Sequence, residues 1–199
     1  MGRTVDYYFV PQSPWTYFGH ERFAALLRET GTQVRVLPMD LGRIFPLSGG
    51  LPLPKRAPQR QAYRLLELRR FSEALGIPLH PEPRFFPVAG DPAARLITAV
   101  AMHDGDAAAM RLTGAVLAAV WAQQRDIASL EVLAQLLDET GLDAQRLQQS
   151  QQADVQARYE AQTQAAIDLQ VFGAPSYVID GELFWGQDRL DFVARKLRA

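Results

Sequence analysis

The sequence predicts an α/β protein in which both chain ends build one sheet domain and the middle of the chain forms an all-helical insertion. Val5–Val10 and Val34–Leu37 have the short β-branched and aromatic patterns of strands, with a helical pattern between them. Ser176–Ile179 and Glu182–Trp185 show strand patterns again near the end of the chain. Between these two regions apolar residues recur at helical spacing, so strands are expected only at the ends.

The first helix has clear start and end signals. Ser13 is a favoured N-cap residue, Pro14 suits the first helical position, and the apolar periodicity continues to Thr30. Gly31 follows as a C-cap, because glycine readily adopts the left-handed backbone conformation of that position. Since the strand Val34–Leu37 comes soon afterwards, this region is expected to form a β-α-β unit with parallel strands.

The middle of the chain is predicted to be a loop followed by helices. Phe45–Pro58 is rich in proline and glycine, which favours a loop and a domain crossing over a regular element. Helices are then expected at Gln59–Leu75, Pro92–His103, Ala107–Gln124, Ser129–Thr140, Asp143–Ser150 and Ala153–Leu169. This arrangement assigns residues 1–45 and 170–199 to the sheet domain and residues 46–169 to the helical insertion.

The end of the chain is predicted to be a β-hairpin followed by a short helix. Asp180-Gly181, between the two C-terminal strands, is typical of a tight hairpin turn. A helix that starts at Asp188 follows the second strand. Its apolar face can pack against the sheet, so the chain is expected to end inside the sheet domain.

Composition excludes several classes of function. The 199 residues include 21 basic and 22 acidic side chains, and the net charge of -1 gives no general attraction for nucleic acid or an anionic membrane. No apolar run approaches the roughly 20 residues that span a bilayer. The start of the chain lacks the apolar stretch of a secretory signal, so the cytoplasm is the expected compartment. The absence of cysteine excludes disulfides and redox chemistry by the chain's own thiols.

Ser13 is the first candidate functional residue, in the segment S-P-W-T at the junction of a strand and a helix. Backbone N–H groups converge at a helix start, and they stabilise a negative charge by about 0.3–1 kcal/mol when exposed and by up to about 2 kcal/mol when partly buried. A thiolate is one anion that such a position can hold. The structural alternative is that Ser13 only caps its helix, and the local pattern alone favours that alternative.

Two further candidates lie in the C-terminal region. Pro175, in F-G-A-P-S-Y, either forms a cis peptide that orients backbone groups toward a peptide-like ligand or simply starts a strand. In W-G-Q-D-R, Gln187 offers amide hydrogen bonds and Asp188 can pair with a ligand's ammonium group. The structural alternative for Asp188 is that it caps the final helix.

These three segments, in this order and at these separations, resemble the glutathione-dependent 2-hydroxychromene-2-carboxylate isomerases and the related kappa-class glutathione transferases. The similarity covers nearly the whole chain, and the isomerases fit best. It rests on V-D-Y-Y-F-V-P-Q-S-P-W-T-Y, R-Q-A-Y, L-G-I-P-L, Y-E-A-Q-T-Q-A-A-I and V-F-G-A-P-S-Y-V-I-D-G-E-L-F-W-G-Q-D-R-L. Both families belong to the DsbA-like branch of the thioredoxin superfamily. The resemblance therefore implies a thioredoxin-like domain formed by both chain ends, with an inserted all-α domain.

The resemblance also implies roles for individual residues. Ser13 would hydrogen-bond the sulfur of glutathione and favour its thiolate, in the place where redox relatives have the first cysteine of C-x-x-C. The backbone of Ala174, beside Pro175, would pair with the main chain of glutathione. Gln187 and Asp188 would receive its γ-glutamyl end. The implied cofactor is glutathione, the substrate a small aromatic molecule, and the assembly a homodimer.

The resemblance also points to one basic residue of the site and shows three positions at which this chain differs from its relatives. Arg60, in R-Q-A-Y, stands where relatives are often basic and would bind a carboxylate of glutathione. Relatives commonly carry an acidic residue where this chain has Val10, and an asparagine where it has Ala89. The asparagine that kappa-class enzymes place before their basic residue is absent from Ser48–Pro52, which favours the isomerase over the kappa-class interpretation.

Histidine catalysis and metal binding are the rival interpretations. His20 follows Ser13 by seven residues, a helical rise of about 10 Å, whereas a direct hydrogen bond needs roughly 2.6–3.2 Å. His80 lies among prolines and His103 near a helix end, so both are expected to be loop or capping residues. No pair of histidines or group of carboxylates has metal-ligand spacing, so no metal site is predicted.

The sequence thus predicts a glutathione-dependent cis-trans isomerase of 2-hydroxychromene-2-carboxylate or a related intermediate of aromatic catabolism. Two alternatives stay open. The first is a kappa-like transferase that leaves glutathione attached to the product, and the second is a non-catalytic module that binds glutathione or a peptide.

Overall fold

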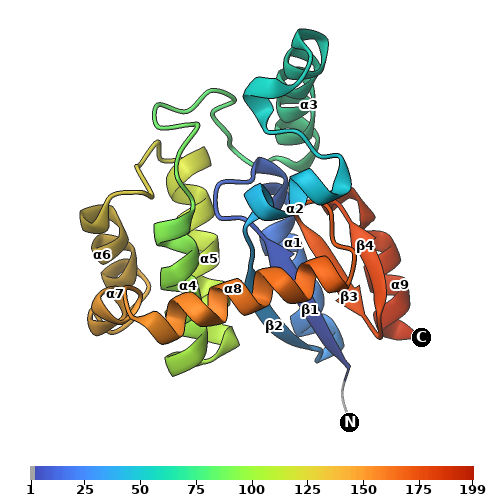
Figure 1. Cartoon of the computed structure of the whole chain (residues 1–199). Helices are drawn as coiled ribbons and strands as arrows, with labels where there is room; N and C mark the ends of the chain where they lie inside the picture. The colour runs from blue at the N-terminus through green and yellow to red at the C-terminus, as the bar shows by residue number, and fades with distance from the viewer. Residues whose placement is uncertain (1–2) are drawn as a thin grey trace.

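The computed structural model describes residues 3–199, so Met1 and Gly2 of the first predicted domain segment lie outside the described residues. At its centre is a sheet with the strand order β2-β1-β3-β4 (Figure 1). The strands are β1 (Thr4–Phe9), β2 (Gln33–Pro38), β3 (Ser176–Ile179) and β4 (Glu182–Trp185). β1 pairs parallel with β2 and antiparallel with β3, so residues from both chain ends share one sheet, as the sequence predicts.

Helices cover both faces of this sheet. Val5, Tyr7 and Phe9 of β1 are buried in the core that includes residues of α1 (Pro14–Thr30) and α9 (Leu190–Arg198). Tyr8 points to the opposite face because side chains alternate along a strand. There it belongs to a smaller core with residues of α2 (Leu41–Ser48) and α8 (Ala153–Asp168), and α8 crosses that face in Figure 1.

The remaining helices lie between β2 and β3 in the sequence, as predicted. They are the α-helices α3 (Pro58–Leu75), α4 (Asp91–Asp104), α5 (Asp106–Trp121), α6 (Leu130–Glu139) and α7 (Gln145–Gln149). The larger core runs without a break from Phe9 in the sheet to Leu96, Trp121 and Leu133 in these helices. No helix within residues 3–199 is long and apolar enough to cross a membrane.

The prediction of a continuous loop at Phe45–Pro58 is wrong. The helix α2 extends to Ser48, and a 3-10 turn, η1, covers Leu53–Lys55. Asp40 explains the start of α2, because its Oδ1 accepts a hydrogen bond from the N–H of Gly42 at 2.7 Å. The density of proline and glycine did not reveal this capped start, which lies before the proline-rich stretch.

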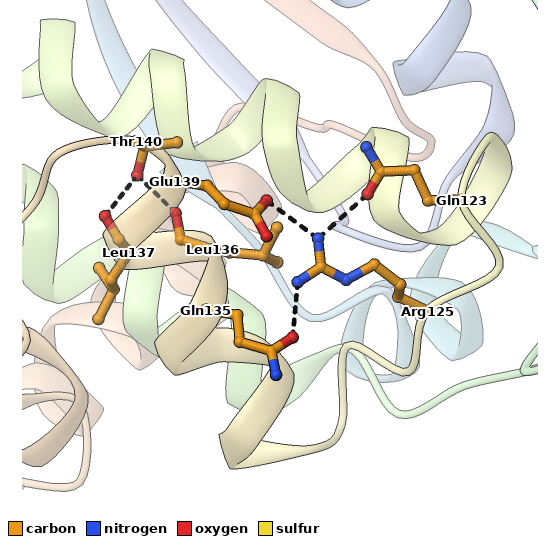
Figure 2. A network of polar contacts seen from close by, with 7 residues as sticks. All are labelled: Gln123, Arg125, Gln135, Leu136, Leu137, Glu139 and Thr140. Carbon is orange, nitrogen blue, oxygen red and sulfur yellow. Dashed lines mark hydrogen bonds and ion pairs between the residues drawn. The ribbon is translucent and has the colours of Figure 1, made fainter.

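The connection between α5 and α6 is held by Arg125 (Figure 2). Its Nη1 donates to Glu139 Oε2 at 3.0 Å and to Gln123 Oε1 at 3.2 Å, while Nη2 donates to Gln135 Oε1 at 2.9 Å. At the end of α6, the hydroxyl of Thr140 donates to the carbonyl of Leu136 at 2.7 Å. The contacts of Arg125 lie at the surface, so they add little to the stability of the fold.

Candidate functional site

Ser13 lies at the junction of β1 and α1 and caps the helix, as the sequence predicts. Its Oγ accepts a hydrogen bond from the N–H of Thr16 at 3.1 Å, and its own N–H donates to the carbonyl of Val10 at 3.1 Å. The residue is 7% exposed. A serine hydroxyl that accepts a bond still has its hydrogen to donate. Ser13 can therefore donate to an anion at the positive end of α1.

Pro175 lies at the same edge of the sheet as Ser13. Ser176, the first residue of β3, pairs with Tyr8 near the end of β1, so the segment before β3 faces the segment that leads into α1. Pro175 is buried, and the Ala174–Pro175 peptide is cis. The fold thus brings two candidates that are far apart in the sequence to one edge of the sheet.

Gln187 and Asp188 are joined to this edge through the backbone. The N–H of Gly186 donates to the carbonyl of Pro175 at 2.9 Å. Gln187 is 2% exposed, whereas Asp188 is exposed and forms an ion pair with Arg189 at 3.0 Å. The prediction of an α-helix that starts at Asp188 needs correction, because a 3-10 turn, η2 (Gln187–Arg189), precedes α9.

Arg22 is a residue of this region that the sequence analysis missed. From the middle of α1, its Nη1 donates to the side-chain oxygen of Gln187 at 2.6 Å and to the main-chain carbonyl of Gln187 at 3.3 Å. Gly19 permits this close packing, since a Cβ at that position would lie 2.9 Å from the Cβ of Gln187. The contact joins residues 165 positions apart, so no local spacing indicates it.

Arg60 is the candidate that no described contact brings to Ser13. It is exposed on the first turn of α3, and within residues 3–199 its side chain has no hydrogen bond or ion pair to the other candidates. It belongs instead to a group of arginines. The positive charge of Arg60 adds to the effect of burial in lowering the pKa of Arg56, and burial and the charge of Arg56 lower the pKa of Arg64 to about 10. This end of α3 is therefore a positively charged surface.

His20 has a structural environment that excludes a pair with Ser13. Its Nε2 lies 3.0 Å from the carbonyl of Met110, so this nitrogen carries the hydrogen, and Nδ1 accepts from the hydroxyl of Tyr7 at 3.3 Å. Burial lowers the pKa of His20, and the charge of Glu21 opposes that effect. Among residues 3–199, no group of three or more His, Asp or Glu side chains could hold a metal ion.

The lowered pKa of His20 predicts a pH-dependent stability. In the unfolded chain its pKa is about 6.5, so below that pH the unfolded state takes up a proton that the folded state resists. The contribution to stability is thus complete above pH 6.5 and is lost as the pH falls, by up to about 1.4 kcal/mol per pH unit. Urea unfolding on both sides of this pH should show a weaker pH dependence for His20→Gln than for wild type. Equal dependence would show that His20 does not titrate in this way.

A family model of the DSBA-like thioredoxin domain matches residues 4–198. The sheet order agrees with this match, and so does the position of Pro175 near the start of α1, which Ser13 caps. The chain is therefore a thioredoxin-like protein of the DsbA type. The chain belongs to the DsbA-like thioredoxin family. Because two 2-hydroxychromene-2-carboxylate isomerases are 30% and 32% identical to it over 94% of its length, it belongs to those isomerases within that family. The fold class predicted from the sequence, with its helical insertion, is confirmed.

The isomerase relatives match almost the whole chain. The 2-hydroxychromene-2-carboxylate isomerase of Pseudomonas putida is 30% identical over 94% of this chain and 90% of its own length. That of Pseudomonas sp. strain C18 is 32% identical over 94% of this chain and 86% of its own. A solved structure of a 2-hydroxychromene-2-carboxylate isomerase superposes with a TM-score of 0.83 at 26% identity, covering 98% of this chain and 94% of that one.

A more distant neighbour shares the fold alone. The cytosolic disulfide reductase DsbM of Pseudomonas aeruginosa, solved with GSH, has a TM-score of 0.71 at 19% identity, over 98% of this chain and 100% of its own. Disulfide reduction needs a thiol, and this chain has no cysteine. The relatives of 30% and 32% identity support an isomerase, and the absence of cysteine excludes disulfide reduction by the chain's own thiols.

Proposed function

We propose that the protein is a glutathione-dependent isomerase of 2-hydroxychromene-2-carboxylate or of a related aromatic intermediate. The main support for this proposal is the position of Ser13. Its buried hydroxyl lies at the start of α1 and has a hydrogen available to donate. Because the chain has no cysteine, a thiol at this position has to come from a bound molecule. The names of the relatives support the reaction, and the DsbM neighbour solved with GSH supports glutathione as a ligand of this fold.

The candidate residues fit the chemistry of glutathione. Ser13 and the N–H groups of α1 would hold its sulfur as the thiolate, which is the form they stabilise. Ala174 and Pro175 would offer backbone groups to its peptide. The carboxylate of Asp188, exposed beside the buried Gln187, would bind the ammonium of its γ-glutamyl end. Arg60 and its neighbouring arginines would attract a carboxylate of glutathione.

When bound, glutathione would supply a thiolate that adds reversibly to a conjugated substrate, so that rotation occurs about the former double bond without net redox change. Ser13 would lower the thiol's pKa by donating a hydrogen bond to the sulfur, and would donate to it again when the negative charge returns to the leaving thiolate. The backbone at Pro175 would hold the ligand's peptide and η2 its γ-glutamyl end, so that its sulfur stays beside the reacting carbon. Donors that are already oriented toward the developing charge need no reorganisation during the reaction.

Product analysis separates this function from its alternatives. With glutathione and 2-hydroxychromene-2-carboxylate, we expect chromatography coupled to mass spectrometry to find a separate product with the mass of the substrate, together with regenerated glutathione. A stable product that carries glutathione would instead show a transferase. Calorimetric binding of glutathione without any turnover would show a binding module, and failure to bind glutathione at millimolar concentration would exclude both the isomerase and the transferase.

Loss of the contact between Arg22 and Gln187 is expected to weaken the binding of glutathione. In Arg22→Met the side-chain oxygen of Gln187 loses a charged donor, which is worth about 1.5–3 kcal/mol, so η2 is held less firmly. We expect glutathione to bind at least about tenfold more weakly, with kcat changed much less. Arg22→Lys should restore part of the affinity. The matched control is Arg28→Met, an exposed arginine of the same helix. Equal affinities of the two methionine variants would dismiss the role of Arg22.

Two other expectations from the resemblance remain predictions. We expect a homodimer, which light scattering of the purified protein would test. We also expect the protein to work in the cytoplasm, where the glutathione pool keeps thiols reduced. Localisation of the tagged full chain would test that compartment.

A further inference from the structure

The structure has a hollow whose lining does not include Ser13, Pro175 or Asp188. It has a volume of about 520 Å³ and opens between the start of α2, the start of α4 and the middle of α8. All of its lining side chains are polar or charged, and those used below are Asp40, Arg43, Asp91, Arg95, Tyr159 and Glu160. Small-molecule sites are usually lined mostly by apolar and aromatic groups. A lining made mainly of charged and polar side chains therefore favours a charged or polar ligand.

The two arginines of this pocket have donors without a charged acceptor. Nε of Arg95 is buried and has no hydrogen-bond partner among residues 3–199. The hydrogen bond that the guanidinium of Arg43 makes is to the neutral side chain of Gln164, at 3.3 Å. Buried donors are normally satisfied, and guanidinium groups match carboxylates in geometry and charge. These donors therefore indicate a carboxylate as one end of the ligand.

The acidic residues of the pocket are held in place by neutral donors and not by these arginines. Oδ1 of Asp91 accepts from the hydroxyl of Tyr159 at 3.2 Å. Burial and the charge of Asp91 raise the pKa of Tyr159, so the phenol stays protonated and remains a donor. Oε1 of Glu160 accepts from the side-chain amide of Gln156 at 2.7 Å. Each carboxylate keeps a second oxygen, which can accept from an ammonium group of the ligand.

We propose that this pocket binds a zwitterionic amino acid or short peptide, with its carboxylate at Arg43 and Arg95 and its ammonium at Asp91 and Glu160. Charges of both signs line one hollow, and within residues 3–199 no ion pair shorter than 4.0 Å joins them. A ligand with both charges would satisfy both sets at once. The site is separate from the proposed thiol site and does not depend on the proposed isomerisation.

The pocket also adjoins the segment that leads into Ser13. A narrow extension of about 60 Å³ shares Asp40, Asp91 and Tyr159 with it and reaches Gln12 and Gly90. The side-chain oxygen of Gln12 is buried there and has no hydrogen-bond partner among residues 3–199, and a Cβ on Gly90 would lie 2.1 Å from it. A ligand in the pocket is therefore expected to perturb the amides of Gln12 and Gly90.

Nuclear magnetic resonance titration of the labelled full chain tests this proposal. The probes are L-alanine and L-alanyl-L-alanine as zwitterions, with N-acetyl-L-alanine and L-alaninamide as forms that lack one charge. We expect a zwitterion to shift amides around the pocket at millimolar concentration and to bind at least tenfold more tightly than both single-charge forms. The better of the two zwitterions identifies a free amino acid or a peptide as the source. Shifts confined to residues 174–188, no shifts, or equal binding of the single-charge forms would overturn the proposal.

The same titration on substituted proteins shows which residues bind the zwitterion. Arg95→Met should weaken binding of the zwitterion at least tenfold, whereas Asp188→Asn, in the proposed thiol site, should leave it unchanged. Because Arg95 is partly buried, Glu160→Gln provides a second variant at an exposed position of α8. It should weaken the zwitterion but not N-acetyl-L-alanine, which has no ammonium. Unchanged affinity in Glu160→Gln together with lost affinity in Asp188→Asn would assign the ligand to the thiol site and overturn the proposal.

Discussion

Ser13→Ala is expected to reduce turnover of the isomerase substrate by about 10- to 100-fold while changing the affinity for glutathione much less. A hydrogen bond to a charged group is worth about 1.5–3 kcal/mol, and the proposed bond from Ser13 to the sulfur is of that kind. Its loss raises the pKa of the bound thiol and leaves the departing thiolate without a donor. The affinity should survive because most of the ligand's contacts would be to its peptide and its two ends.

Steady-state kinetics and calorimetry on the same variants check this prediction. Ser13→Ala also removes a helix cap, which costs about 0.5–2 kcal/mol of stability, so a cap control is needed. Ser129 provides it, because its Oγ accepts from the N–H of Val132 at 3.4 Å at the start of α6. Ser129→Ala should lower stability and leave turnover intact, and Ser13→Thr should retain part of the activity. If Ser13→Ala is as active as Ser129→Ala, Ser13 has no role beyond its cap.

Trp121→Ala is expected to lower the free energy of unfolding by about 3–5 kcal/mol. The indole is 0% exposed, and its ring centroid lies 4.9 Å from that of Phe86. The guanidinium carbon of Arg64 lies over the indole, 5.6 Å from its centroid. Its removal leaves a cavity between the inserted helices and the segment before α4. At about 2–4 °C per kcal/mol for a chain of this size, the melting temperature should fall by roughly 6–20 °C.

Two probes show whether this loss affects the whole molecule. Far-ultraviolet circular dichroism reports mainly the helices, whereas the fluorescence of Trp15 and Trp185 reports α1 and the edge of the sheet. Since the larger core continues from Phe9 to Trp121, both signals should shift together. Trp185→Ala is the control, because that side chain is 51% exposed and its removal should change the free energy of unfolding little. Helices that melt before the fluorescence changes would contradict a continuous core.

Local signals explain why much of the fold could be predicted. The helix Pro14–Thr30 has its cap, its proline and its terminal glycine within one segment, and the structure confirms all three. The hairpin was predictable because Asp180 and Gly181 favour its turn, and both have positive φ angles, of 51° and 80°. The helix α2 was missed because glycine and proline dominate the segment after Ile44, while its capping residue lies before that segment.

The candidate site was predictable only in part. Ser13 and Pro175 stand in recognisable segments, but their meeting depends on the pairing of β1 with β3. Arg22 reaches Gln187 across the packing of α1 on η2, which no periodicity describes. The charged pocket combines side chains from α2, α4 and α8, so its existence follows from tertiary packing alone. Arg60 stands in the recognisable segment R-Q-A-Y, but it is exposed on the first turn of α3. Its binding of a glutathione carboxylate is therefore still a proposal.

A crystal structure of the protein with bound glutathione tests the central claim most directly. We expect the sulfur within hydrogen-bond distance of Ser13 Oγ and the γ-glutamyl ammonium at the carboxylate of Asp188. Glutathione found with its sulfur away from Ser13, or bound in the charged pocket of α2, α4 and α8 and not at Ser13, would contradict it.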